Sequence, residues 1–156
     1  MKLTPYLRLC THFFVAVIFA FVIASLFHSQ FVMAELSKVG VNISFSDRLS
    51  MSIDDLLGLY PTYGIVIALS FCIAFIVVSF IVKRVSLSPY ILYPLAGAAG
   101  VTAALLAMQP ILDITLLASA RSTYGFVCQS LAGAMGGAVF AHLRGKVHLN
   151  NTSTPS

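Results

Sequence analysis

Charged residues are scarce in this chain. Of its 156 residues only 9% are Asp, Glu, Lys or Arg, whereas 59% are hydrophobic and the mean hydropathy is +0.97. Soluble domains carry about 25% charged residues, so this composition excludes an ordinary soluble protein. Apolar blocks take up roughly half of the chain, which leaves too little sequence for a separate soluble domain with its own core. The sequence is that of an integral membrane protein.

The apolar blocks contain no Asp, Glu, Lys or Arg in their interiors. Ionisable residues inside a membrane are the usual sign of proton relays, ion paths and voltage sensors, so their absence disfavours a pump or a proton-coupled carrier. The sequence also lacks nucleophile elbows, zinc-type His-Glu helices, phosphate-binding loops and dinucleotide fingerprints. No cluster of polar residues near one membrane face is visible. We therefore expect a protein that is not an enzyme and needs no cofactor.

Cysteine is present but forms no redox motif. Cys10, Cys72 and Cys128 are far apart, and no Cys-x-x-Cys pair exists. This spacing gives no support to thiol-disulfide exchange of the membrane oxidoreductase kind. We interpret the three cysteines as small, buried hydrophobic residues.

Four apolar blocks have the length of a membrane span. They cover residues 13–34, 64–82, 90–108 and 124–143. At 1.5 Å per residue each block reaches about 28–30 Å, which matches a hydrocarbon core. The alternation of apolar and polar residues that barrel strands need is absent. We therefore predict an all-α, polytopic membrane protein with four transmembrane helices, in which residues 1–149 form one domain and residues 150–156 a disordered tail.

Positive charge gathers on one predicted side of the membrane. With four spans, the N-terminal end, the 83–89 loop and the C-terminal tail share a side that carries no side-chain carboxylate. Its six cations are Lys2, Arg8, Lys83, Arg84, Arg144 and Lys146. The positive-inside rule then places both termini in the cytoplasm, in a bacterial inner membrane or a plasma membrane. The formal charge of +4 thus reflects topology, and without a folded basic patch we expect no nucleic-acid partner.

The first span allows a second interpretation. Lys2 and Arg8 precede an apolar core that ends in Val32-Met33-Ala34, as in a secretory signal peptide. Cleavage there would leave three spans in the same orientation. The apolar core is at the upper length limit for a signal peptide, which favours a retained span.

The outer segment, residues 35–63, is the longest polar piece. Apolar and polar residues alternate from Val39 to Phe45, which outlines one short strand, and an irregular loop is the simpler alternative. Ser52 followed by Asp55 predicts the start of a helix, because serine is a preferred N-cap and an acidic residue in the first turn complements the helix dipole.

Proline marks three further places. Pro61, with Gly64, is expected to interrupt the chain where the second span begins. Pro94 lies inside the third span, where the missing backbone donor predicts a kink. Pro110 precedes residues 111–118, which are apolar but too short to cross a membrane, so we predict an interfacial helix there. The alternative is a re-entrant hairpin of the kind found in channels.

Small residues dominate the third and fourth spans. Gly97 and Gly100 lie in an alanine-rich stretch, and Gly133 and Gly137 have the GxxxG spacing. In lipid no hydrophobic drive brings helices together, so close contacts between small residues are what hold a bundle. We predict that these four glycines pack helices of the same chain against each other, with a homo-oligomeric face as the alternative.

Few polar residues are candidates for a site. Thr102 and Gln129 fall at a similar depth in antiparallel spans, which predicts a hydrogen bond between them that acts as structural glue. His12 and His142 both lie at cytoplasmic ends of spans, where they could bind haem or a metal between two helices. The simpler interpretation is that both are interfacial side chains.

Three functions are compatible with these features. Small-residue and aromatic faces without intramembrane charge favour a non-enzymatic accessory or scaffold subunit, whose partners are the lipid bilayer and another membrane protein or a second copy. A small oligomeric carrier or channel, built around Pro94, Gly97 and Gly100, is the alternative. A membrane protein that binds haem, quinone or lipid is the third possibility.

Overall fold

Four long helices make up most of the structure. The computed structural model describes residues 4–40, 42–82, 84, 85, 87–112 and 123–152. Its helices are α1 (Thr4–Lys38), α2 (Phe45–Ile81), α3 (Pro89–Leu112) and α4 (Thr123–Thr152). All four are long and apolar enough to cross a membrane. The prediction of an all-helical chain with four such helices is confirmed.

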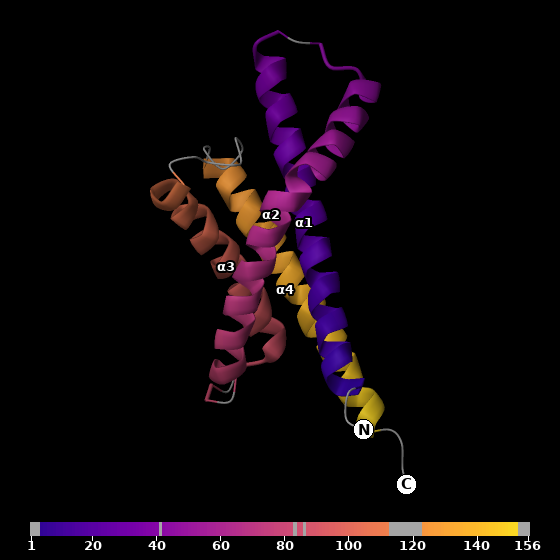
Figure 1. The fold of residues 1–156 in the computed structure, drawn as a ribbon, viewed down its shortest axis with the longest axis vertical. Coiled ribbons are helices and arrows are strands. Elements are labelled where there is room, and N and C mark those ends of the chain that lie inside the picture. The colour runs from indigo at the N-terminus through magenta and orange to yellow at the C-terminus, as the bar shows by residue number, and fades with distance from the viewer. Residues whose placement is uncertain (1–3, 41, 83, 86, 113–122, 153–156) are drawn as a thin grey trace.

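Each helix packs mainly against two others. α1 and α3 both contact α2 and α4. The chain runs up and down in sequence order, so the start of α1, the end of α4 and the α2–α3 connection lie at one end of the molecule (Figure 1). Short connections between antiparallel neighbours are typical of this bundle topology.

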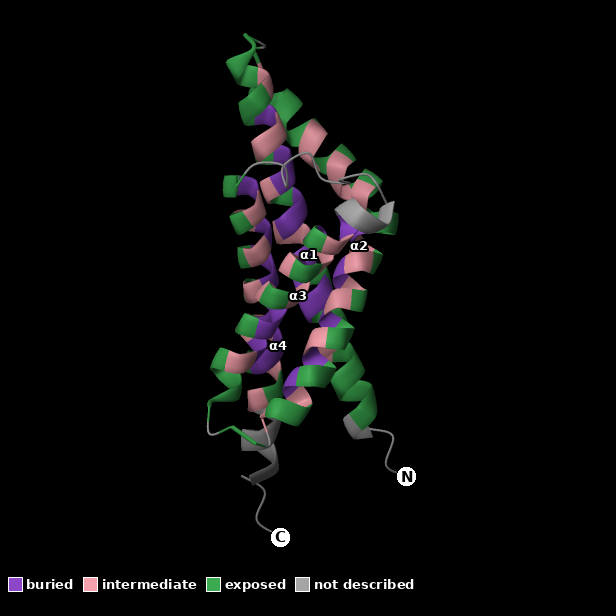
Figure 2. Cartoon of the chain, turned by 90° about the vertical axis from the view of Figure 1, so that its left-hand side faces the viewer, coloured by how far each residue is buried: buried purple, intermediate pink, exposed green. Residues whose placement is uncertain are grey.

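α1 and α2 are much longer than the spans predicted for them. Their 35 and 37 residues reach about 52 and 55 Å, whereas a hydrocarbon core is about 30 Å thick. The excess length forms a helical hairpin that extends beyond α3 and α4, at the end away from the termini (Figure 1). Exposed residues dominate its tip (Figure 2). The outer segment 35–63 thus consists mainly of two helix extensions.

Between α1 and α2 the described residues form an irregular connection, the simpler of the two alternatives for Val39 to Phe45, and the short strand is wrong. None of the described residues in this stretch is in a strand, because α1 continues to Lys38 and α2 begins at Phe45. Gly40 lies in the turn between them with a left-handed φ of 86°. Glycine adopts this conformation without steric cost, so the chain can reverse within a few residues.

α2 begins earlier than predicted, with Ser44 and not Ser52 as its N-cap. The Ser44 hydroxyl accepts a hydrogen bond from the Asp47 backbone N–H (3.2 Å), while the Asp47 carboxylate accepts bonds from the Ser44 hydroxyl (2.7 Å) and backbone N–H (3.1 Å). These two bonds to the carboxylate, the side-chain bond foremost, hold the pKa of Asp47 below its ordinary value. Ser52 instead lies inside the helix, where its hydroxyl donates to the Arg48 carbonyl oxygen (2.8 Å). Both serines have an Asp three residues later, so the capping pattern alone does not choose between them.

Pro61 and Gly64 do not interrupt α2. The helix runs through both residues and continues to Ile81. Proline is tolerated in membrane helices where neighbouring helices hold the backbone in place. Tyr63, between the two, is 1% exposed. Its side chain therefore packs against the bundle and holds the α2 backbone at this point.

The ends of α3 and α4 also differ from the predicted bounds. α4 continues to Thr152, three residues into the segment predicted to be a disordered tail. α3 ends at Leu112, within the segment predicted to be an interfacial helix. The remainder of that segment and residues 153–156 lie outside the described residues.

An aromatic core joins α2, α3 and α4. The Phe75 ring centroid lies 4.9 Å from that of Phe71, 5.3 Å from that of Tyr93 and 4.6 Å from that of Phe140. All four side chains are buried. Each aromatic pair adds about 0.5–1.5 kcal/mol beyond the burial of its area. The cluster is therefore a strong anchor in the half of the bundle nearer the termini.

Candidate functional site

α3 and α4 approach each other closely along the predicted glycines. A Cβ atom on Gly133 would lie 2.5 Å from the carbonyl oxygen of Gly97 and 2.7 Å from a methyl carbon of Val101. A Cβ on Gly97 would overlap the carbonyl oxygen of Gly133, and one on Gly137 would overlap that of Tyr93. Backbone contact of this kind is what small residues permit between membrane helices.

Gly100 faces a different neighbour. A Cβ there would lie 3.1 Å from the Ser70 carbonyl oxygen and 3.2 Å from the Ala74 Cβ, both on α2. The structure thus places the four predicted packing glycines against other helices of the same chain. Pro94 belongs to the same contact region, because its Cα lies 2.9 Å from the Cβ position of Gly137. The kink predicted at Pro94 stays a prediction.

Gln129 links three helices in the interior. Its side chain is fully buried, its Oε1 accepts a hydrogen bond from the Tyr63 hydroxyl (3.0 Å), and its Nε2 donates to the Ala24 carbonyl oxygen (3.0 Å). These bonds connect α4 to α2 and to α1. Both ends of the amide are therefore satisfied, as burial in an apolar interior requires.

The predicted hydrogen bond between Thr102 and Gln129 is wrong. Thr102 on α3 instead shares a hydrogen bond with Ser130, with 2.7 Å between the hydroxyl oxygens. Consecutive helical residues point about 100° apart, so Ser130 faces α3 while Gln129 faces α1 and α2. A similar position along two antiparallel helices does not determine the direction in which a side chain points.

A second group of polar residues joins α1 to α2. The Ser29 hydroxyl donates to a carboxylate oxygen of Asp55 (2.7 Å) and lies 3.1 Å from the Ser25 carbonyl oxygen. His28, which is 8% exposed, lies within electrostatic reach of Asp55. The Ser25 hydroxyl is fully buried and has no hydrogen-bond partner among the described residues.

These residues form a polar cluster between α1 and α2, whereas none is visible in the sequence. Ser25, His28 and Ser29 have the i, i+3, i+4 spacing of one helix face, a signal that the sequence contains. The partner carboxylate is on another helix, in the extended hairpin, and no sequence pattern points to it. The Ser29 bond joins α1 to α2, and the two Gln129 bonds join α4 to α2 and to α1. Together these hydrogen bonds hold the three helices in one register.

The histidine and cysteine candidates give no assembled site. His12 is half-buried on α1 and His142 is exposed on α4, and the haem or metal hypothesis for them stays a prediction. Among the described residues, no three His, Cys, Asp or Glu side chains gather where a metal ion could bind. The interpretation of the cysteines as buried is wrong for Cys10 and Cys72, which are exposed, and Cys128 is half-buried.

A long apolar groove runs between α2 and α3 on the surface of the bundle. Its volume is about 830 Å³. Mostly small residues of α3 line one side, namely Leu92, Leu95, Ala96, Ala99, Gly100, Ala103, Ala104 and Ala107. Mostly branched residues of α2 line the other side, namely Val66, Leu69, Ser70, Ile73, Ala74, Val77, Val78 and Ile81. Among the described lining residues the one polar side chain is Ser70, whose hydroxyl donates to the Val66 carbonyl oxygen (2.7 Å). The groove therefore suits an apolar occupant.

Comparisons with known proteins add no functional information. No family model matches the sequence, and neither the curated proteins nor the solved structures include a significant match.

Proposed function

We propose that this chain is a small, non-enzymatic accessory or scaffold subunit of a bacterial inner membrane or a plasma membrane. In this proposal it docks one transmembrane helix of a larger membrane partner in the groove between α2 and α3. The observation that carries the proposal is the groove itself, because six of the eight α3 residues that line it are alanine or glycine. Small residues let a further helix approach the backbone closely, which is how helices associate in lipid.

The distribution of small residues on α3 supports an external helix. Gly97 packs against α4 and Gly100 packs against α2. Ala99 and Ala103, in contrast, are exposed in the groove. They are four residues apart and so share one helix face. This small-xxx-small pair is thus left without a partner among the described helices, which distinguishes the groove from an ordinary lipid-facing surface covered by large side chains.

The concave shape favours a different protein over a second copy. In a symmetric dimer the same patch meets itself, so two grooves would face each other and leave a void. A head-to-tail contact between copies needs a rotation that closes a ring, and it otherwise leaves the groove of the last copy open and extends into filaments. A single helix of a larger partner fills the groove without either difficulty.

Site-specific photo-crosslinking in native membranes tests the proposal. A photoreactive phenylalanine analogue at Leu95, in the groove and 60% exposed, should give one adduct clearly heavier than twice the 16.7 kDa chain. The same analogue at Leu131 on α4, 52% exposed and outside the groove, is the control and should not give that adduct. An adduct at the mass of two chains would refute the choice of partner. Flux through the purified chain in liposomes would favour a carrier or channel instead.

Filling the groove provides a second test. Ala99→Leu together with Ala103→Leu should abolish the adduct formed at Leu95, because the added side chains occupy the space of the partner helix. Ala138→Leu, the same change at an exposed position on α4, should leave the adduct intact. Equal adduct formation in the filled and control variants would overturn the docking site.

The proposed orientation has both termini in the cytoplasm. The charge asymmetry supports it, since the side with the termini carries cations and no side-chain carboxylate. A fluorescent protein that matures only in the cytoplasm, fused after Ser156, should fluoresce. A fusion within the 35–63 hairpin, next to Gly40, should remain dark.

A further inference from the structure

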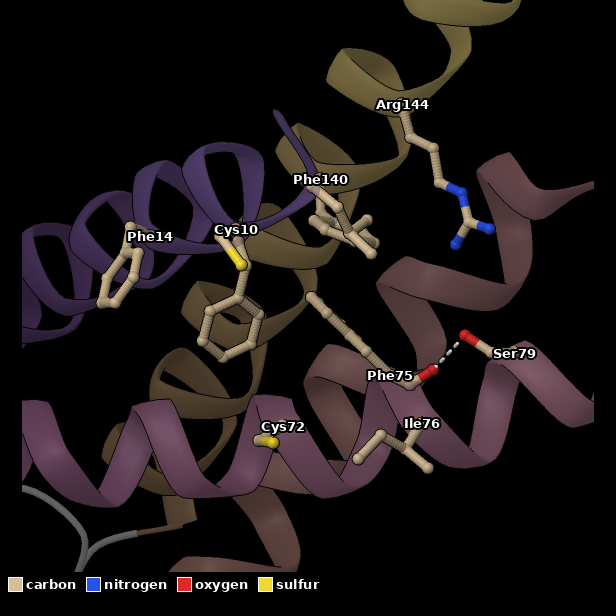
Figure 3. Close-up of a pocket in the computed structure, with 10 residues that line it drawn as sticks. Cys10, Phe14, Cys72, Phe75, Ile76, Ser79, Phe140 and Arg144 are labelled. Atoms are coloured by element: carbon tan, nitrogen blue, oxygen red, sulfur yellow. Dashed lines mark hydrogen bonds between the residues drawn. The ribbon is translucent and has the colours of Figure 1, made fainter. Parts of the chain in front are cut away.

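A second apolar groove lies between α1 and α2, at the end of the bundle that carries the termini (Figure 3). α1 and α2 cross near the middle of the molecule and splay apart toward this end (Figure 1). The groove has a volume of about 240 Å³. Aromatic rings form much of its wall, among them Phe13 and Phe14 of α1, Phe75 of α2 and Phe140 of α4.

Among the described residues that line this groove, Arg144 is the single charged one. Its guanidinium donates a hydrogen bond to the Tyr93 hydroxyl and lies 5.6 Å from the centre of the Tyr93 ring. A guanidinium carries five N–H donors, so this contact positions the group and leaves donors for an anion. Among the described lining residues the one hydroxyl is that of Ser79, which donates to the Phe75 carbonyl oxygen at 2.7 Å (Figure 3).

The groove therefore combines one anion-binding group with an apolar trough along the helices. From Ser79, near the end of α2, to Cys72 the lining extends over seven residues, or about 10 Å toward the middle of the bundle. We infer that the groove binds an anionic phospholipid, with the phosphate on Arg144 and part of one acyl chain along Phe75 and Ile76 toward Cys72. This site is independent of the proposed helix-docking groove.

Size and charge favour a lipid over a peptide occupant. The volume is less than a third of that between α2 and α3, and a helix with its side chains is about 10 Å wide. Arg8 and Arg84 add positive charge at the same end of the molecule, where no carboxylate of the described residues offsets it. An anionic headgroup is therefore preferred over a zwitterionic one.

Native mass spectrometry tests the preference for an anionic headgroup. The purified chain, in micelles with equal amounts of phosphatidylglycerol and phosphatidylcholine, should retain one phosphatidylglycerol in preference. Arg144→Gln should lower this retention about tenfold, the effect of losing one charge-assisted hydrogen bond, and Arg144→Lys should restore part of it. Arg84→Gln is the matched control, because Arg84 lies at the same end but outside the groove. Equal losses in the Arg84 and Arg144 variants would indicate only general charge attraction and would overturn the site.

The native cysteines provide a test that needs no variant. Cys10 and Cys72 line the groove and are exposed, whereas Cys128 lies outside it. Phosphatidylglycerol should slow the alkylation of Cys10 and Cys72 by N-ethylmaleimide in micelles and leave the rate at Cys128 unchanged. Equal slowing by phosphatidylcholine would refute the headgroup preference. Unchanged rates at Cys10 and Cys72 would refute binding of the acyl chain in the groove.

Discussion

The contact between α3 and α4 can be tested by adding a single methyl group. An ideal Cβ on Gly133 lies 2.5 Å from the Gly97 carbonyl oxygen, whereas ordinary van der Waals contact begins at 3.4 Å. Gly133→Ala therefore requires the two backbones to separate by about 0.9 Å, the difference between these distances. Overpacking of this kind costs about 1–3 kcal/mol, so we expect Gly133→Ala to have a free energy of unfolding lower by about that amount than the same substitution at an unhindered helix position.

Gly58→Ala is the matched control. Gly58 lies within α2, and a Cβ there would have no atom within 4 Å. The same methyl group should then be neutral or stabilise by up to about 1 kcal/mol, because alanine has the higher helix propensity. Both substitutions replace glycine with alanine. Gly133→Ala should lower the free energy of unfolding, whereas Gly58→Ala should leave it unchanged or raise it.

Reversible unfolding in mixed micelles, by titration with dodecyl sulfate and followed by circular dichroism, measures both effects. Gly133→Ala should unfold at a lower mole fraction of dodecyl sulfate than the parent protein, and Gly58→Ala at an equal or higher one. If Gly133→Ala is as stable as Gly58→Ala, then α3 and α4 are not in backbone contact and the reasoning fails.

Three further predictions concern the polar residues. Tyr63→Phe and Gln129→Leu, made singly and together, should show a coupling energy of about 0.6–1.7 kcal/mol in the same unfolding assay, and a value near zero would contradict their hydrogen bond. Asp55→Asn should lower the unfolding midpoint, and Ser29→Ala should then have little added effect; additive losses would argue against their contact. The pKa of Asp47 is below its ordinary value, so its helix cap is intact above about pH 4 and is lost as the pH falls through the folded pKa. As the pH falls through this folded pKa, hydrogen exchange in the first turn of α2 should accelerate in the parent protein. The same acceleration in an Asp47→Asn variant would show that another group is responsible.

The candidate sites could be predicted from the sequence only in part. The four packing glycines could be predicted because small residues in membrane helices are enriched where two helices are in close contact. The link from Ser29 to Asp55 was not identifiable, because it depends on how far the hairpin of α1 and α2 extends and on how α2 is rotated. Thr102 illustrates the same limit, since its partner Ser130 is adjacent in sequence to the residue that was predicted.

The sequence by itself determined that the chain consists of four long helices. Apolar blocks without charge cannot leave backbone groups unpaired in lipid, and helices satisfy those groups within each segment. The tertiary structure alone decided which faces meet. A helix turns about 100° per residue, so contacts such as that of Gly133 with Gly97, the two grooves and the position of Arg144 beside Tyr93 depend on helix rotation and crossing. Those quantities are set by the packing of all four helices together, and no local pattern specifies them.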